Sequence, residues 1–231
     1  MKKVFGILCG ITLLAGLVPA RAADMSKMND RLNNAADVLQ EIMHTPDRGI
    51  PQSILAGASC VLVVPHYKKG AFIIGGDYGQ GVATCRTGHG WSAPVFIKLT
   101  GGSFGWQIGG QSTDLVLVAM NHHGMQDLIR DNFKLGGDAA ASAGPVGRNA
   151  QAGTDWKLGA EFLTYSRSKG LFAGLDLTGT AVNQNHDDMR AEYQSDIPFE
   201  RVLDGAVPVP PNAQHFVRTV ARYFVVSRVN Q

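Results

Sequence analysis

The sequence predicts an α+β fold: a single domain with a curved, glycine-rich, mainly antiparallel sheet packed with amphipathic helices, in which barrel-like closure of the sheet is left open. Two observations predict it. Short apolar and β-branched runs between residues 60 and 120 are interrupted by glycines, which in strands mark bulges, tight bends or close approaches of another backbone. Before and after this region, apolar residues recur at every third or fourth position, as in amphipathic helices.

The first 22 residues have the composition of a secretory signal peptide. Two lysines precede an apolar run, Val4–Val18, and small residues at positions 20 and 22 fit a cleavage site. The run is shorter than the roughly 20 residues that span a membrane. We therefore expect residues 1–22 to be removed and the domain, residues 23–231, to be periplasmic or secreted and peripheral at a membrane surface.

Removal of this segment changes the charge balance of the chain. It takes away three basic residues and no acidic one, so 18 Lys and Arg remain against 19 Asp and Glu. Global charge therefore favours no nucleic-acid partner, and attraction to an anionic surface must come from local patches.

Two of the three cysteines remain in the mature chain. Cys9 lies in the leader and follows Leu8 rather than a small residue, which argues against a lipoprotein anchor. Export places Cys60 and Cys85 in an oxidising compartment, where a disulfide persists. A bridge between them would close a loop of about 25 residues, and two buried free thiols are the alternative. The chain has no Cys-x-x-Cys pattern of a metal site.

The helices and strands can be placed in order along the chain. An amphipathic helix is expected over Met25–Met43, and because its polar face carries three acids beside Lys27 and Arg31, we favour docking on the core over a position on a membrane. A short helix follows from Pro51 to Ala58. Strands with the spacing of an antiparallel meander are then expected at Cys60–Val64, Ala71–Thr84, Val95–Thr100, Phe104–Ile108 and Leu115–Met120. Later elements are a helix over Gly124–Phe133, strands at Gly159–Ser166 and Leu171–Gly179 joined by the turn SRSKG, and helices at His186–Gln194, Pro198–Leu203 and Asn212–Phe224, the last being a C-terminal extension.

One motif suggests catalysis. Residues Gly101–Gly105 fit the G-x-S-x-G pattern of hydrolases, but that serine must sit between a strand and a long helix, whereas a glycine-rich, β-like segment follows here. A serine hydrolase using Ser103 is therefore the least favoured alternative. His122 and His123 are adjacent, so they point in different directions and do not chelate one ion. We predict no catalytic residue, no metal and no cofactor.

Several long segments resemble one known family. GWSAP, IGGQSTDLV, AGPVGR and SKGLFAGLDLTG occur in the order found in the SYLF domain, and the resemblance covers Ala23–Tyr193. It implies a lipid-binding module rather than an enzyme, in a bacterial-type exported member. Eukaryotic members of that family occur beside SH3 or FYVE modules and are associated with phosphoinositides and, in some cases, with actin.

The resemblance and the local basic residues together predict the site. We expect an anionic phospholipid or phosphoinositide-like headgroup to contact basic turns and the last helix, with an apolar groove for an acyl chain. Lys68 and Lys69 are placed in a turn between strands. The other expected lipid contacts are Arg148 in AGPVGR, Arg167 and Lys169 in SRSKG, and Arg218 and Arg222 in the last helix.

The prediction depends on convergence, because each residue alone is more often a solvated charge. Scattered positions would refute the site but not the family. The alternative function is an envelope scaffold whose sheet pairs with a protein partner or with a second copy, as a homo-oligomer.

Overall fold

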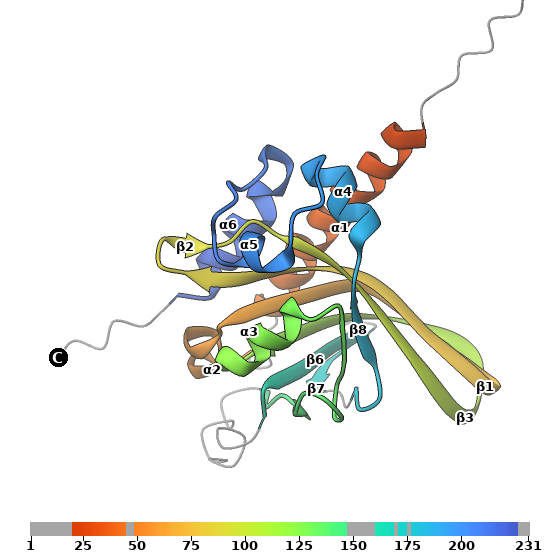
Figure 1. The fold of residues 1–231 in the computed structure, drawn as a ribbon. Helices are drawn as coiled ribbons and strands as arrows, with labels where there is room; N and C mark the ends of the chain where they lie inside the picture. The colour runs from red at the N-terminus through yellow and green to blue at the C-terminus, as the bar shows by residue number, and fades with distance from the viewer. Residues whose placement is uncertain (1–19, 45–48, 147–159, 169–170, 175–176, 226–231) are drawn as a thin grey trace, which may run out of the picture.

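Two long antiparallel strands, β1 (Cys60–Thr87) and β3 (Val95–Ala119), form the centre of the fold and are joined through the short strand β2 (Gly90–Trp91). Figure 1 shows them as a ribbon, orange to green, that crosses the whole domain. The computed structural model describes residues 20–44, 49–146, 160–168, 171–174 and 177–225. The β-branched residues at the start of β1 and the end of β3 favour extended backbone, and they are buried.

The β1–β3 ribbon doubles back on itself, so that the first part of β1 lies across its last part. The Cα atoms of Cys60 and Cys85 are 4.0 Å apart although both residues belong to β1. A Cβ atom placed on Gly81 would lie 2.4 Å from the carbonyl oxygen of Val63, which shows how closely the two limbs approach. The pairing with β3 shifts register just after Ala71, and such a bulge bends a ribbon locally.

Shorter strands extend the sheet along the outer edge of β3. Within the described residues the sheet has eight strands, and its pairings are antiparallel except for β5 with β6. The strand β6 pairs with the end of β3, and β8 pairs with its beginning. The bounds of these strands are β4 (Asn132–Lys134), β5 (Ala141–Ala143), β6 (Phe162–Ser168), β7 (Leu171–Gly174) and β8 (Ala181–Gln184).

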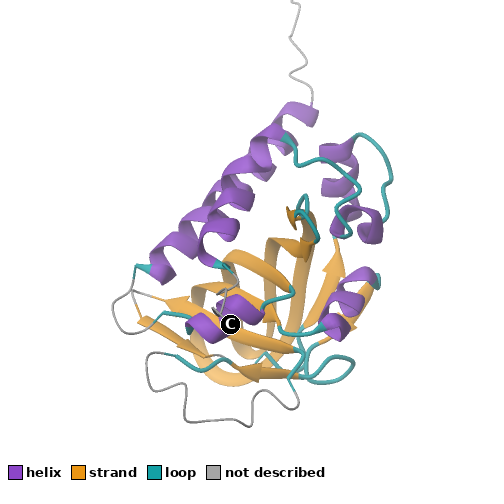
Figure 2. Ribbon diagram, turned by 90° about the vertical axis from the view of Figure 1, so that its left-hand side faces the viewer, coloured by secondary structure: helices purple, strands orange, loops and turns teal. Residues whose placement is uncertain are grey.

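The curved sheet forms a half-barrel, and helices cover one end and the rim of it (Figure 2). The longest, α1 (Ala20–Met43), buries a stripe that includes Leu32, Leu39 and Ile42 and packs against β1. It also packs against α4 and α6. The other helical segments are α2 (Gln52–Gly57), α3 (His122–Ile129), α4 (His186–Tyr193), α5 (Phe199–Leu203), the 3-10 turn η3 (Pro211–Ala213) and α6 (Gln214–Tyr223).

The predicted fold class is confirmed, but the predicted number of strands is wrong. The five strands expected between residues 60 and 120 are two long strands, because the glycines bend the ribbon and let its limbs approach without ending the pairing. The helix expected from Gly124 to Phe133 begins at His122, where Asn121 accepts a hydrogen bond from Gly124 N and caps it, and Phe133 belongs to β4. The short strands β4, β5 and β8 were not predicted.

The cysteine pair lies where the limbs of β1 meet. In the structure Cys60 and Cys85 form a disulfide, and both residues are buried. Beside it, the Arg86 amide donates a hydrogen bond to the Ser59 carbonyl at 2.7 Å. The predicted signal peptide, residues 1–22, lies outside the described residues except for its last three, which begin α1.

Candidate functional site

A groove of about 310 Å³ lies between the N-terminal half of α1 and the part of β1 where the ribbon leaves the body of the domain. Basic side chains outnumber acidic ones along it, since Asp30 is the one carboxylate among its lining residues. These are Lys27, Asp30, Arg31 and Asn34 from α1 and Pro65, His66, Lys68, Tyr78, Gly79 and Gln80 from β1.

The helix and the strand place their basic residues on the groove for different reasons. Lys27, Arg31 and Asn34 recur at helical spacing and therefore share one side of α1, next to its buried stripe. On β1, His66 has a positive φ of 53° at a register shift in the pairing with β3. His66 and the exposed Lys68, two residues further on, both line the groove next to this irregularity.

Arg31 is a fixed part of the groove wall, because its side chain is held by several contacts. Its guanidinium is paired with Asp188 of α4, donates to Gln80 Oε1 at 2.5 Å, and lies 5.8 Å from the centre of the Phe96 ring. Only 10% of the Arg31 side chain is exposed. Asn185 also donates to the Asp188 carboxylate, which holds that carboxylate in place.

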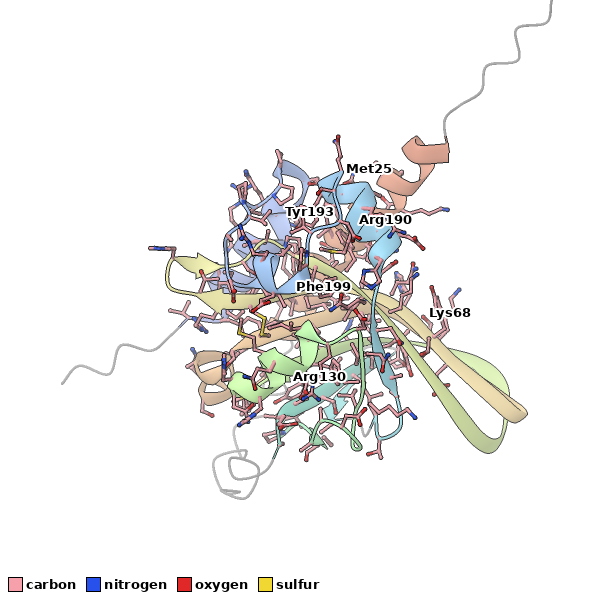
Figure 3. All side chains as sticks on the ribbon, in the orientation of Figure 1. Met25, Lys68, Arg130, Arg190, Tyr193 and Phe199 are labelled. Carbon is pink, nitrogen blue, oxygen red and sulfur yellow. A yellow bond between two sulfur atoms is a disulfide. The ribbon has the colours of Figure 1, made fainter. Side chains whose placement is uncertain are left out.

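Lys27 and Lys68 are the exposed cations of the groove. Lys68 lies near the start of the projecting ribbon, opposite Ser112 of β3 (Figure 3). It makes no ion pair with another residue in the described part of the chain. Tyr78, 47% exposed, adds an aromatic ring beside these ammonium groups. Two ammonium groups beside an aromatic rim can bind an anionic group that has apolar neighbours.

A second polar cluster joins α1 to the sheet beside the groove. Arg167 at the end of β6 donates to Asp114 Oδ2 of β3 at 2.9 Å and is paired with Glu41 of α1. Asp114, which is nearly buried, also accepts a hydrogen bond from the His66 amide at 3.0 Å. Arg167 therefore connects three elements, β6, β3 and α1.

The structure brings together few of the predicted lipid contacts. Lys68 and Lys69 lie inside β1, so their predicted position in a turn is wrong; the ribbon continues because a bulge replaces the turn. Arg148 and Lys169 lie outside the described residues. Among the predicted contacts that can be placed, only Lys68 lines the groove. Their role in lipid binding stays a prediction.

The arginines of α6 lie on the other flank of α1. Asn212, just before α6, donates to Asn29 of α1 at 2.8 Å. Residues two apart on a helix face away from each other, so Asn29 lies opposite the groove-lining Lys27. Arg218 and Arg222 are exposed, while Phe216 and Val220 of the same helix are buried.

Sequence reasoning missed the contribution of α1 and the aromatic rim. Composition shows the charges of α1 as nearly balanced, but it does not show that Asp30 faces the groove with Lys27 and Arg31 while other acids face elsewhere. Glu41, for example, pairs with Arg167. The spacing of Lys27 and Arg31 was the available signal.

The structure gives no catalytic context to Ser103. Residues 101–105 lie within β3, not between a strand and a helix, as the glycine-rich segment after the motif predicted. His122 and His123 open α3. Among the described residues no group of three or more His, Cys, Asp or Glu is placed to hold a metal ion. None of the helices in that part of the chain is both long and apolar enough to span a bilayer.

A second cavity of about 310 Å³ is lined by α2 and by Arg86. Burial lowers the pKa of Arg86, whose guanidinium donates to the carbonyls of Ala58 and Phe224 at 3.1 and 3.0 Å. It also lies 4.7 Å from the centre of the Trp91 ring. These contacts join α2, β2 and the end of α6, which is a structural role.

Comparison with known proteins gives a family and several relatives. The family Ysc84, described as "Las17-binding protein actin regulator", matches residues 100–223. The chain is 36% identical over 175 residues to the SH3 domain-containing protein PJ696.02 of Schizosaccharomyces pombe, covering 74% of this chain and 40% of that protein. It is 31% identical over 196 residues to the SH3 domain-containing YSC84-like protein 1 of Rattus norvegicus, covering 82% and 57%.

A yeast relative agrees with these matches. The chain is 33% identical over 176 residues to Protein YSC84 of Saccharomyces cerevisiae, covering 74% of this chain and 37% of that protein. The chain thus spans about two fifths to three fifths of the length of these relatives. The family match extends over more than half of the chain, from β3 to α6. On this evidence the chain belongs to the Ysc84 family, the family of the SYLF domain.

Proposed function

We propose that the protein is a non-enzymatic module that binds anionic phospholipid at a cell envelope, with the α1–β1 groove as the headgroup site. The observation that carries the proposal is the position of Lys27 and Lys68 on two different elements beside one groove with an exposed tyrosine. A cleaved leader would deliver the module to the periplasm or outside the cell. There it would act peripherally at a membrane surface.

Electrostatics supports a membrane surface as the ligand. Each Lys or Arg near an anionic bilayer contributes about 1 kcal/mol, so the two exposed lysines together account for about a 30-fold change in affinity. Arg31 supplies a fixed positive wall, although Asp188 already neutralises much of its charge. The expected binding is therefore modest and sensitive to salt.

Vesicle co-sedimentation tests the proposal. The mature protein is mixed with phosphatidylglycerol-containing or pure phosphatidylcholine vesicles, at low and at high salt. We expect binding to the anionic vesicles that weakens with salt, and about 30-fold weaker binding for the double variant Lys27→Gln/Lys68→Gln.

The matched control is Arg218→Gln/Arg222→Gln on the opposite flank of α1. It removes the same charge from exposed positions and should leave affinity within about threefold, since the screening length is about 8 Å at physiological salt. Equal loss for both double variants would refute the groove as the site. An absence of binding to any vesicle would refute the function.

A protein-binding function is the second candidate. The family description names Las17 binding and actin regulation, which are protein interactions. In the described strands, the outer edge of β3 between the residues paired with β8 and those paired with β6 has no partner strand. A dimer in light scattering that vesicles do not alter would favour this function, whereas a strict monomer would count against self-association.

A further inference from the structure

The bend of the β1–β3 ribbon projects from the domain. We define the ribbon tip as residues 70–76 of β1 and 102–110 of β3, which pair with each other around the register shift. Figure 1 shows this part extending away from the helices at the lower right. Both outer edges of the tip lack a partner strand among the described residues, because β6 and β8 meet β3 elsewhere and β2 meets only the end of β1.

The composition of the tip is unusual for a projecting two-stranded ribbon. It contains no charged residue, and two lysines, Lys68 and Lys69, immediately precede it. Its large apolar residues are Phe72, Ile73, Ile74, Phe104, Trp106 and Ile108. The nearest acids along the two strands are Asp77 and Asp114, which are both buried in the body of the domain.

The length of the tip matches the depth of a bilayer interface. Tyr67 before the tip and Asp77 after it are the buried residues of β1 nearest to the tip, and each lies five residues from Phe72. Five residues of strand separate Tyr67 from Phe72, which at about 3.3 Å per residue is a reach of about 17 Å. One headgroup layer is about 5–8 Å thick, so a tip of this length can cross it and reach the acyl chains.

We propose that the ribbon tip inserts into the interfacial layer of an anionic membrane while the groove at its base contacts the headgroups. The inference rests on the proposed function, because it requires the same membrane. The charge pattern favours an anionic membrane as the partner of the tip. An uncharged apolar segment preceded by lysines fits an anionic lipid surface, and tryptophan and tyrosine are enriched at membrane interfaces. Lys68 lines the groove and lies two residues before the tip, so binding at both places orients the domain with its ribbon toward the lipid.

A site-specific fluorescent label tests insertion. Ser103→Cys places one reactive thiol in the tip, and the native pair is blocked as a disulfide. His89→Cys, in the exposed turn at the opposite end of the same ribbon, is the matched control. Each variant carries a polarity-sensitive fluorophore and is mixed with phosphatidylglycerol-containing vesicles, with and without a quencher on the acyl chains, while sedimentation measures binding in parallel.

We expect a blue shift and acyl-chain quenching for the label at position 103 and neither for the label at 89. Phe104→Ser should weaken vesicle binding about tenfold through lost apolar burial. If the protein sediments with the vesicles but the fluorescence of the label at position 103 does not change, insertion is refuted and headgroup binding is not. If the protein does not sediment with the vesicles, both insertion and headgroup binding are refuted. A change at 103 that depends on protein concentration without vesicles shows that a second copy covers the tip, which also overturns insertion.

Discussion

The substitution Gly81→Ala tests whether the doubled ribbon is the determinant of this fold. The added Cβ would lie 2.4 Å from the carbonyl oxygen of Val63 and 2.6 Å from Val64 Cγ2, whereas ordinary contacts begin at 3.4 Å. Because the nearest atom belongs to the backbone, no rotamer change relieves the overlap, and the two limbs of β1 must separate by about 1 Å. Overpacking in a core of this kind costs about 1–3 kcal/mol, and we expect the upper part of that range.

Thermal and urea unfolding of the mature protein measure the effect. A loss of 2–3 kcal/mol corresponds to a decrease in Tm of about 4–12 °C for a domain of this size. Gly76→Ala is the control, because a Cβ at that position meets nothing within 4 Å and its φ is not positive. Replacing a strand glycine there should be neutral or stabilise by up to about 1 kcal/mol. Equal stability of the Gly81 variant and the wild type would refute the close crossing of the limbs.

Three further predictions concern buried charge and the disulfide. Asp188→Ala should lower the free energy of unfolding by about 3–5 kcal/mol, because it leaves the buried Arg31 without its carboxylate partner. Asp187→Ala at the exposed neighbouring position is the control and should change this free energy by less than about 0.5 kcal/mol. Similar losses for the two variants in urea unfolding would contradict the buried ion pair. Burial raises the pKa of Glu192, so the folded state holds this proton more tightly, and the associated stability is lost as pH rises from the ordinary value of 4.5 through the raised pKa. Glu192→Gln should therefore gain stability relative to wild type as the pH rises above 4.5, and a difference that stays constant with pH would argue against it. Reduction of the disulfide, which spans 25 residues, should lower the free energy of unfolding by about 3–4 kcal/mol, and a reductant that leaves the urea midpoint unchanged would count against that stabilisation.

Local patterns of the sequence were sufficient for the helices. The recurrence of apolar residues at every third or fourth position predicted amphipathic helices, and the structure buries Leu32, Leu39 and Ile42 of α1 and Phe216 and Val220 of α6 on such faces. Helical periodicity depends on neighbours three and four residues apart, so it is visible without any knowledge of the fold.

The strands were predicted less well for a physical reason. A glycine in a strand is compatible with a turn, a bulge or a close crossing, and the neighbouring residues do not distinguish these. Gly81 lies at a close crossing because Val63 approaches it. Val63 lies 18 positions earlier along the chain and reaches Gly81 only because the ribbon bends double. Short strands such as β5 have no periodicity of their own and form because β6 is beside them.

The candidate site, too, was predictable in its residue types but not in its contacts. The basic residues could be named from the sequence, but their partners could not, because each partner is distant along the chain. Arg31 meets Asp188, 157 positions away, and Arg167 meets Asp114, 53 positions away. An ion pair depends on spatial distance, which composition does not contain.

The sequence by itself determined the family, the α+β class and the faces of the main helices, since these follow from motifs and from short-range periodicity. Only the tertiary structure decided that β1 and β3 are single strands bent double, that Arg167 is held by two carboxylates, and that Lys27 and Lys68 share one groove. The physical reason is that close packing and charge pairing act between atoms a few ångströms apart, and the chain brings those atoms together only when it folds.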